Sequence, residues 1–191
     1  MYYQVRALLS EPATLAVGIA ALVLVLAVSP WLSRRLRRPM WLVAMTCGSV
    51  GAIVAASAGP TAFTGGLRTP ARCLRSLTEL DSGISLIRAG AGDALPNLLL
   101  YLPAGFLLTI LTRRAGGTFV SLVVLSAAIE VGQGLIGRSC TSADWMTNSL
   151  GAALGAGAGA VLLLVLPVGA SGAGGGSASS GDTVPVGRGA S

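Results

Sequence analysis

Five long apolar runs divide the chain, and arginines, prolines or polar stretches separate them. Each run has close to the roughly 20 residues with which an α-helix crosses the hydrocarbon core of a bilayer. The sequence therefore predicts an all-α fold, a polytopic membrane helix bundle of about five transmembrane helices within residues 1–168. The predicted spans cover residues 14–32, 40–58, 94–112, 118–136 and 144–166.

Two further segments are too polar to span a membrane. Residues 59–93 are rich in Gly, Pro and Arg, and we expect them to form a loop. Residues 169–191 consist mostly of Gly, Ser and Ala, a composition that cannot bury enough apolar surface to fold. We therefore predict a disordered tail after the last helix.

Arginines next to the runs indicate the orientation. They follow the first and third runs, at Arg34, Arg35, Arg37, Arg38, Arg113 and Arg114. A cleaved signal peptide has its charges before its apolar stretch, so the first run is predicted to stay as a helix. Because short cytoplasmic loops concentrate positive charge, we expect the N-terminus and loop 59–93 outside and the C-terminus in the cytoplasm. That outer loop also carries arginines, with acidic residues among them.

Composition supports an integral membrane protein in the cell membrane, with the lipid bilayer as its first partner. Of 191 residues, 53% are hydrophobic and only 10% are charged, too few to cover a soluble domain. The net charge of +6 would suggest nucleic acid in a soluble protein, but here arginine charge sets topology, so no nucleic-acid partner is expected. The chain has no His and its three Cys are scattered, so we expect no metal and no cofactor.

Two of the three cysteines fall in segments that are predicted to lie outside. Cys73 and Cys140 would meet an oxidising environment, whereas Cys47 lies within a span. A disulfide between the first two is therefore one possible pairing. It requires α-carbons within about 7 Å of each other.

Small residues recur at four-residue spacing along the fifth run. Gly151, Gly155 and Gly159 would lie on one helix face, with alanines on a neighbouring stripe. Such a stripe lets another helix backbone approach closely. We favour packing inside one bundle over association of two copies.

Polar residues gather at the predicted outer ends of the last three helices, and we take seven as candidate site residues. They are Asp93, Asn97, Glu130, Gln133, Arg138, Asp144 and Asn148. Spacings of three and four residues place the pairs of each helix on one face, and short connections bring matching helix ends together. We therefore predict that all of them but Asp93 line one cavity that opens to the outer leaflet.

Simpler structural roles remain open for these residues. The amides could be interhelical hydrogen-bond partners, and Asp144 could cap its helix. Glu130 could be protonated or paired with Arg138. It lies about two turns inside its helix, where a carboxylate costs roughly 2.5–3.5 kcal/mol and persists when it faces a partner or a wet cavity.

Three short motifs in this order resemble the VanZ-like family. They are D-x-x-x-N-x-x-x-Y-x-P-x-G-F in residues 93–106, E-x-x-Q in 130–133, and R-x-x-x-S-x-D-x-x-x-N-x-x-G in 138–151. Many members of that family have His at the position of Asn97, so a role that needs an imidazole does not carry over to this chain. The resemblance implies a bacterial cell-envelope protein, linked in the family to low-level resistance to the glycopeptide teicoplanin.

Three functions are compatible with these observations. We favour a non-enzymatic envelope component that binds a lipid-linked cell-wall precursor or alters the access of glycopeptides to it. The alternative is a membrane-embedded enzyme on a lipid phosphate, with Glu130 as general acid or base, Asp144 ionised and Arg138 on the phosphate. The sequence offers it no His and no clear nucleophile, so its catalytic residues are unknown. A small transporter is the weakest, because no inverted repeat is visible.

Overall fold

The computed structural model describes residues 12–58, 69–88, 94–136 and 140–166, with side chains from residue 16 onward. These residues form seven helices and no strand. The helices are α2 (Pro12–Leu36), α3 (Met40–Ala58), α4 (Pro70–Leu77), α5 (Leu80–Arg88), α6 (Ala94–Thr112), α7 (Ala115–Leu135) and α8 (Ser142–Val165). Five of them, α2, α3, α6, α7 and α8, are long and apolar enough to cross a membrane. The predicted all-α bundle of about five spans is confirmed.

The helix boundaries follow local chemistry. Helix α8 begins two residues before the predicted span, because the Thr141 hydroxyl accepts a hydrogen bond from the Asp144 amide (3.3 Å) and so caps the helix. Helix α7 begins three residues before its predicted span, at Ala115. Its first turn therefore starts directly after the arginine link from α6.

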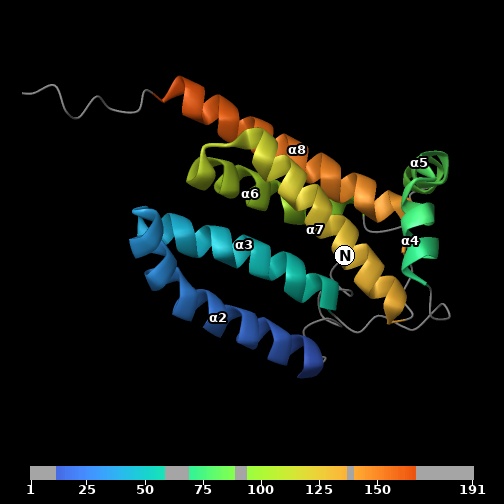
Figure 1. Cartoon of the computed structure of the whole chain (residues 1–191), viewed down its shortest axis with the longest axis horizontal. Helices are drawn as coiled ribbons and strands as arrows, with labels where there is room; N and C mark the ends of the chain where they lie inside the picture. Colours follow the sequence, from blue (N-terminus) through green and yellow to red (C-terminus); the bar gives the residue numbers. More distant parts are fainter. Residues whose placement is uncertain (1–11, 59–68, 89–93, 137–139, 167–191) are drawn as a thin grey trace, which may run out of the picture.

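The five spans are arranged as two groups that lie side by side (Figure 1). Helices α6, α7 and α8 form the first group, and the α2–α3 hairpin lies against it through α3, which contacts α6 and α7. A central cluster of buried side chains joins the groups: Ile53, Tyr101, Ala104, Leu122 and Ala152. Helix α2 lies at the edge, and only 6% of its span is buried. Its exposed leucines and valines suit contact with lipid.

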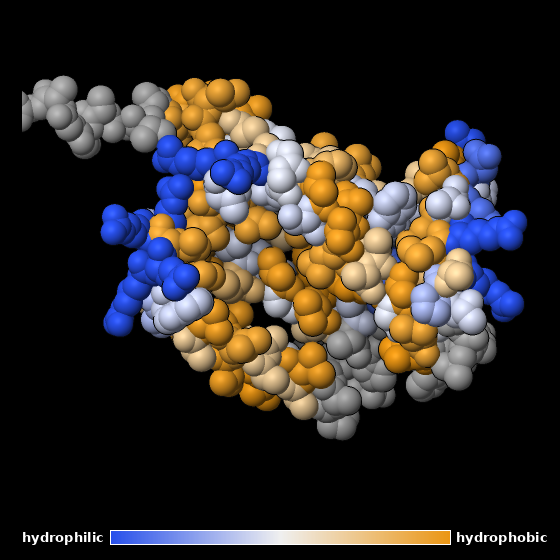
Figure 2. Space-filling model, viewed as in Figure 1, coloured by the Kyte–Doolittle hydropathy of each residue, from blue (hydrophilic) through white to orange (hydrophobic). Residues whose placement is uncertain are grey.

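Polar surface gathers at two opposite ends of the molecule, with a wide apolar band between them (Figure 2). The α2–α3 link and the α6–α7 link lie at the same end, and α4 and α5 lie at the other (Figure 1). Both links contain an arginine in the left-handed backbone region, Arg37 with φ 52° and Arg113 with φ 58°. Each residue directly follows a helix, where such a conformation ends the helical hydrogen bonding.

Helices α6 and α8 pack closely through small residues. A Cβ added to Gly151 would meet the backbone of Leu98, and one added to Gly155 would meet the backbone of Leu102 and Phe106. Gly105 makes the reciprocal contact, because a Cβ there would lie 2.6 Å from the carbonyl oxygen of Ala152. The predicted stripe that includes Gly159 therefore lies against α6 inside the bundle.

The loop predicted over residues 59–93 contains two short helices, which corrects that interpretation. Helix α4 starts with a Thr69 N-cap and Pro70 at its first position, and α5 follows after two residues. Both lie across the ends of α7 and α8 (Figure 1). Gly83 of α5 packs so closely on α8 that a Cβ there would lie 2.8 Å from the Ser142 hydroxyl.

A disulfide fixes α4 to the segment before α8. Cys73 and Cys140 are bonded, with α-carbons 5.8 Å apart, so the possible pairing is confirmed. Both are buried with Leu77, and the Ser76 hydroxyl donates to the carbonyl of Cys140 (3.2 Å). The short helices are therefore covalently attached to the helices that carry the polar site.

Candidate functional site

Asp144 lies at the start of α8 and joins α6 to it. The Asn97 side-chain amide on α6 donates to one carboxylate oxygen (2.8 Å), and the Thr141 hydroxyl donates to the other (2.7 Å). Asn97 and Asp144 are both half-buried. The carboxylate thus accepts hydrogen bonds from two elements in addition to its position at a helix N-terminus, which favours negative charge.

Glu130 reaches the same point from α7. Its carboxylate accepts a hydrogen bond from the backbone amide of Thr141 (3.2 Å), and the residue is only 3% exposed. Thr141 therefore holds two carboxylates at once, Glu130 through its amide and Asp144 through its hydroxyl. We call Asn97, Glu130, Thr141 and Asp144 the outer layer of the site.

A second set of polar side chains lies one turn deeper on the same three helices, and we call it the inner layer. Tyr101 follows Asn97 by four residues, Ser126 precedes Glu130 by four, and Asn148 follows Asp144 by four. All three are buried, and the Asn148 amide donates to the Ser126 hydroxyl (2.9 Å). Each step of four residues is about one helical turn, or about 6 Å.

Two polar atoms of the inner layer lack a hydrogen-bond partner among the described residues. They are the Tyr101 hydroxyl and the Asn148 carbonyl oxygen. The Tyr101 hydroxyl lies near the side chains of Ser126 and Glu130, but it makes no hydrogen bond of good geometry to either of them. Buried polar atoms are normally paired, so this layer has hydrogen-bonding capacity for water or for a group that enters the site.

The structure does not bring all the predicted residues together. Gln133 lies apart from the two layers, because its amide donates to the carbonyl of Ser57 on α3 (3.2 Å). Asp93 and Arg138 lie outside the described residues. None of the described members of the predicted set lines the cavities along α8, beside α4 or between α2 and α3. One cavity shared by all six stays a prediction.

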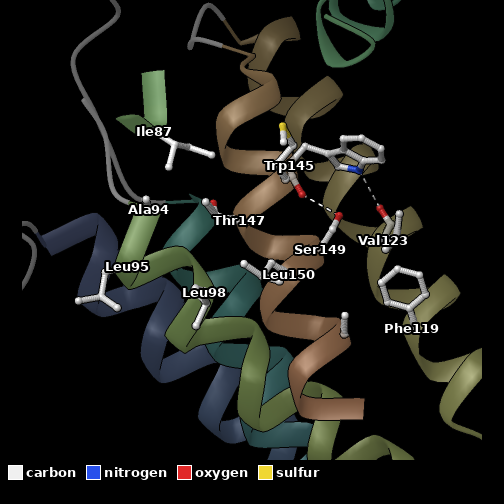
Figure 3. A pocket seen from close by; sticks show the side chains of 12 residues that line it. Ile87, Ala94, Leu95, Leu98, Phe119, Val123, Trp145, Thr147, Ser149 and Leu150 are labelled. Atoms are coloured by element: carbon white, nitrogen blue, oxygen red, sulfur yellow. Dashed lines mark hydrogen bonds between the residues drawn. The ribbon is translucent and has the colours of Figure 1, made fainter. Parts of the chain in front are cut away.

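An apolar groove of about 680 Å³ lies along the opposite face of α8 from Asp144 and Asn148 (Figure 3). Helix α8 lies between the two walls of the groove, which α6 and α7 form. Trp145 lies at the end of the groove next to α5. Its indole N–H donates to the carbonyl of Val123 on α7 (3.4 Å). The lining residues are Ile87, Ala94, Leu95, Leu98, Phe119, Val123, Trp145, Met146, Thr147, Ser149, Leu150 and Ala153.

Sequence reasoning included Asn148 but missed Tyr101 and Ser126 of the inner layer and the role of Thr141. The four-residue step from each predicted residue to a hydroxyl or amide one turn deeper was the available signal, but hydroxyls in spans usually bond to their own helix. Ser29 and Thr46 do so here. Ser126 and Tyr101 could therefore not be distinguished from them by type alone.

The site can recognise a polar group by hydrogen bonding. Carboxylates are acceptors, so a group bound by Glu130 or Asp144 would present hydroxyl or amide hydrogens. Within residues 12–58, 69–88, 94–136 and 140–166, no three His, Cys, Asp or Glu side chains gather to hold a metal ion. The arrangement therefore suits a group that donates hydrogen bonds, such as a hydroxyl or an amide.

Comparison with known proteins places these helices in one family. Searches of curated proteins and of solved structures gave no significant match. The family model for VanZ/LLP1 matches residues 40–164, which run from the start of α3 nearly to the end of α8 and include both layers of the site. With its five apolar helices, this chain is a multi-pass membrane protein that belongs to the VanZ/LLP1 family.

Proposed function

We propose that this protein acts at the outer leaflet of the bacterial cell membrane, where it binds a lipid-linked envelope precursor and thereby changes susceptibility to glycopeptides such as teicoplanin. The observation that carries the proposal is the pair of carboxylates held by Thr141. A buried carboxylate in an apolar bundle is costly, and apolar packing would be cheaper if stability were the only requirement. Glu130 and Asp144 therefore favour a binding role.

The orientation of the site supports this assignment. The arginines of the α2–α3 and α6–α7 links lie at one end, which the positive-inside rule assigns to the cytoplasm. The two layers lie toward the opposite end, with α4, α5 and the disulfide. Disulfides persist in oxidising compartments, so the Cys73–Cys140 bond favours the same assignment.

The composition of the chain favours binding over acid–base catalysis. It contains no His, the residue that most often serves as general acid or base at neutral pH. The two carboxylates of the outer layer accept hydrogen bonds from Thr141, an arrangement that suits recognition of a donor group. A non-enzymatic component is therefore the function that we propose.

Replacing Glu130 by Gln tests the proposal. The amide keeps the shape and can still accept from the Thr141 amide, so the fold should survive while the charge is removed. Glu79→Gln is the matched control, because it removes the same charge from an exposed position between α4 and α5. In a host lacking the native gene, we expect Glu130→Gln to lose the teicoplanin phenotype at near-normal membrane levels and Glu79→Gln to retain it. A Glu130→Gln variant with the full phenotype would contradict the proposal.

A further inference from the structure

The disulfide packs on the face of α7 that carries Glu130. Glu130 and Gly134 are four residues apart, so they share one face of the helix. A Cβ added to Gly134 would lie 3.5 Å from the Cys73 sulfur and 3.6 Å from the Cys140 Cβ. The Cys73 sulfur also lies 3.5 Å from the carbonyl oxygen of Glu130. The disulfide is therefore in direct contact with the turn of α7 that presents the buried carboxylate.

The second cysteine directly precedes Thr141, the residue that contacts both carboxylates of the outer layer. The peptide bond between Cys140 and Thr141 is planar and rigid, so the backbone of Cys140 places the Thr141 amide. Cys140 is held twice by α4, through its sulfur to Cys73 and through its carbonyl oxygen, which accepts from the Ser76 hydroxyl (3.2 Å). Helix α4 therefore determines where the Thr141 amide lies.

The two hydrogen bonds that Thr141 donates to carboxylates differ in what creates them. Its hydroxyl bonds to Asp144 three residues later, which is a local contact at a helix N-terminus. Its backbone amide bonds to Glu130, which lies eleven residues earlier on another helix. Helix-capping rules produce the first contact in any background, whereas the second requires that residue 140 be held against α7. The disulfide supplies that constraint.

A purely stabilising disulfide would act in another way. In the chain-entropy account, a disulfide restricts the unfolded chain and so favours the whole native structure at once. Every buried amide that exchanges by global unfolding would then gain the same protection. A disulfide that positions Thr141 acts mainly on one contact. The two roles therefore predict different patterns along the chain.

We propose that the Cys73–Cys140 disulfide is a positioning element of the polar site, which holds the Thr141 amide on the Glu130 carboxylate. Reduction by a dithiol would transfer two electrons and two protons to the disulfide and give two thiols, while the dithiol becomes a disulfide. Cys47 is a free thiol in both forms. The outer layer is then complete only where disulfides persist, outside the reducing cytoplasm. As an account of activity, this inference rests on the proposed function, but the contact itself does not.

Amide hydrogen exchange of the detergent-purified full chain, resolved to single amides before and after reduction with dithiothreitol, tests the inference. We expect protection of the Thr141 amide to fall about tenfold on reduction, while that of Ala152 in the buried centre of α8 stays unchanged. In the oxidised chain, Glu130→Ala should lose the same protection. Glu130→Gln is the matched control and should retain it, because its amide oxygen still accepts. Unchanged protection at Thr141, or an equal fall at both amides, would overturn the proposal.

The reverse measurement decides the matter if the reduced chain unfolds. Coupling is reciprocal, so the contact between Glu130 and Thr141 must stabilise the disulfide by the factor by which the disulfide stabilises the contact. In a dithiothreitol redox buffer, Glu130→Ala should therefore shift the ratio of disulfide to thiol form about tenfold toward thiol. Asn97→Ala is the control, because it removes a hydrogen bond of the same layer that does not involve Thr141. No shift in Glu130→Ala, or an equal shift in Asn97→Ala, would overturn the proposal.

These measurements fail independently of the proposed function. Unchanged protection at Thr141 together with a lost Glu130→Gln phenotype would remove the positioning role and leave the proposed function standing. Reduced protection at Thr141 together with an intact Glu130→Gln phenotype would establish the positioning role and refute the proposed function.

Discussion

Gly155→Ala tests the close packing of α6 against α8. The added methyl group would meet the carbonyl oxygen of Leu102 and would lie 2.9 Å from the amide nitrogen of Phe106. Both atoms belong to the backbone, so no side-chain rotation can relieve the contact. The two helices must move apart. Gly157 is the matched control, because it lies on the same helix and a Cβ there has nothing within 4 Å.

The expected magnitude follows from two opposing effects. Alanine stabilises a helix interior by roughly 0.5–1 kcal/mol relative to glycine, and this gain applies at both positions. Inserting a methyl group into a filled contact costs about 1–3 kcal/mol, and this cost applies only at Gly155. We therefore expect Gly155→Ala to be less stable than Gly157→Ala by about 1–3 kcal/mol, which is a factor of about 5–150 in the unfolding equilibrium.

Reversible unfolding in mixed detergent micelles measures this difference. Adding denaturing detergent while following the fluorescence of Trp145 reports the transition, since its indole bridges α7 and α8. Phe replaces Trp31 and Trp41 in all variants so that one fluorophore remains. Equal stability of the two alanine variants, or a more stable Gly155→Ala, would refute the close contact between α6 and α8.

Two other predictions concern orientation and the outer layer. A single Cys at Ser82 on α5, in a chain without the native cysteines, should react with a membrane-impermeant thiol reagent in intact cells, and protection until lysis would reverse the proposed orientation. A double-mutant cycle of Asn97→Ala and Asp144→Ala should give a coupling energy of about 0.6–2 kcal/mol in the same unfolding assay, as expected for an interhelical hydrogen bond. Strictly additive effects would show that their 2.8 Å contact does not contribute to stability.

The membrane spans could be predicted from the sequence because apolar length alone determines them. The two short helices could not, since α4 and α5 have eight and nine residues and mixed polarity. Their stability comes from tertiary packing, such as that of Cys73 and Leu77 against the ends of α7 and α8. Such packing cannot be recognised from the polar composition of this segment. The Thr69–Pro70 pair was the local signal for a helix start.

The candidate site could be predicted in part. Helical spacing predicted that Asn97, Glu130 and Asp144 face each other, and hydrogen bonds now join them through Thr141. The direction of Gln133 could not be predicted, because three residues along a helix rotate a side chain by about 60° from its neighbour. That rotation turns the side chain toward α3, and no pattern in the sequence places α3 beside this face of α7.

The arginines with left-handed backbone conformation in the α2–α3 and α6–α7 links show a conflict between local conformation and global topology. Glycine would adopt φ near 55° freely, whereas this conformation costs a residue with a Cβ roughly 1–2 kcal/mol of conformational free energy. Arg37 and Arg113 occupy these positions nonetheless, directly at helix ends where positive charge directs insertion. A redesign toward the locally preferred glycine would make the isolated links more stable while weakening the signal that decides which way the chain enters the membrane.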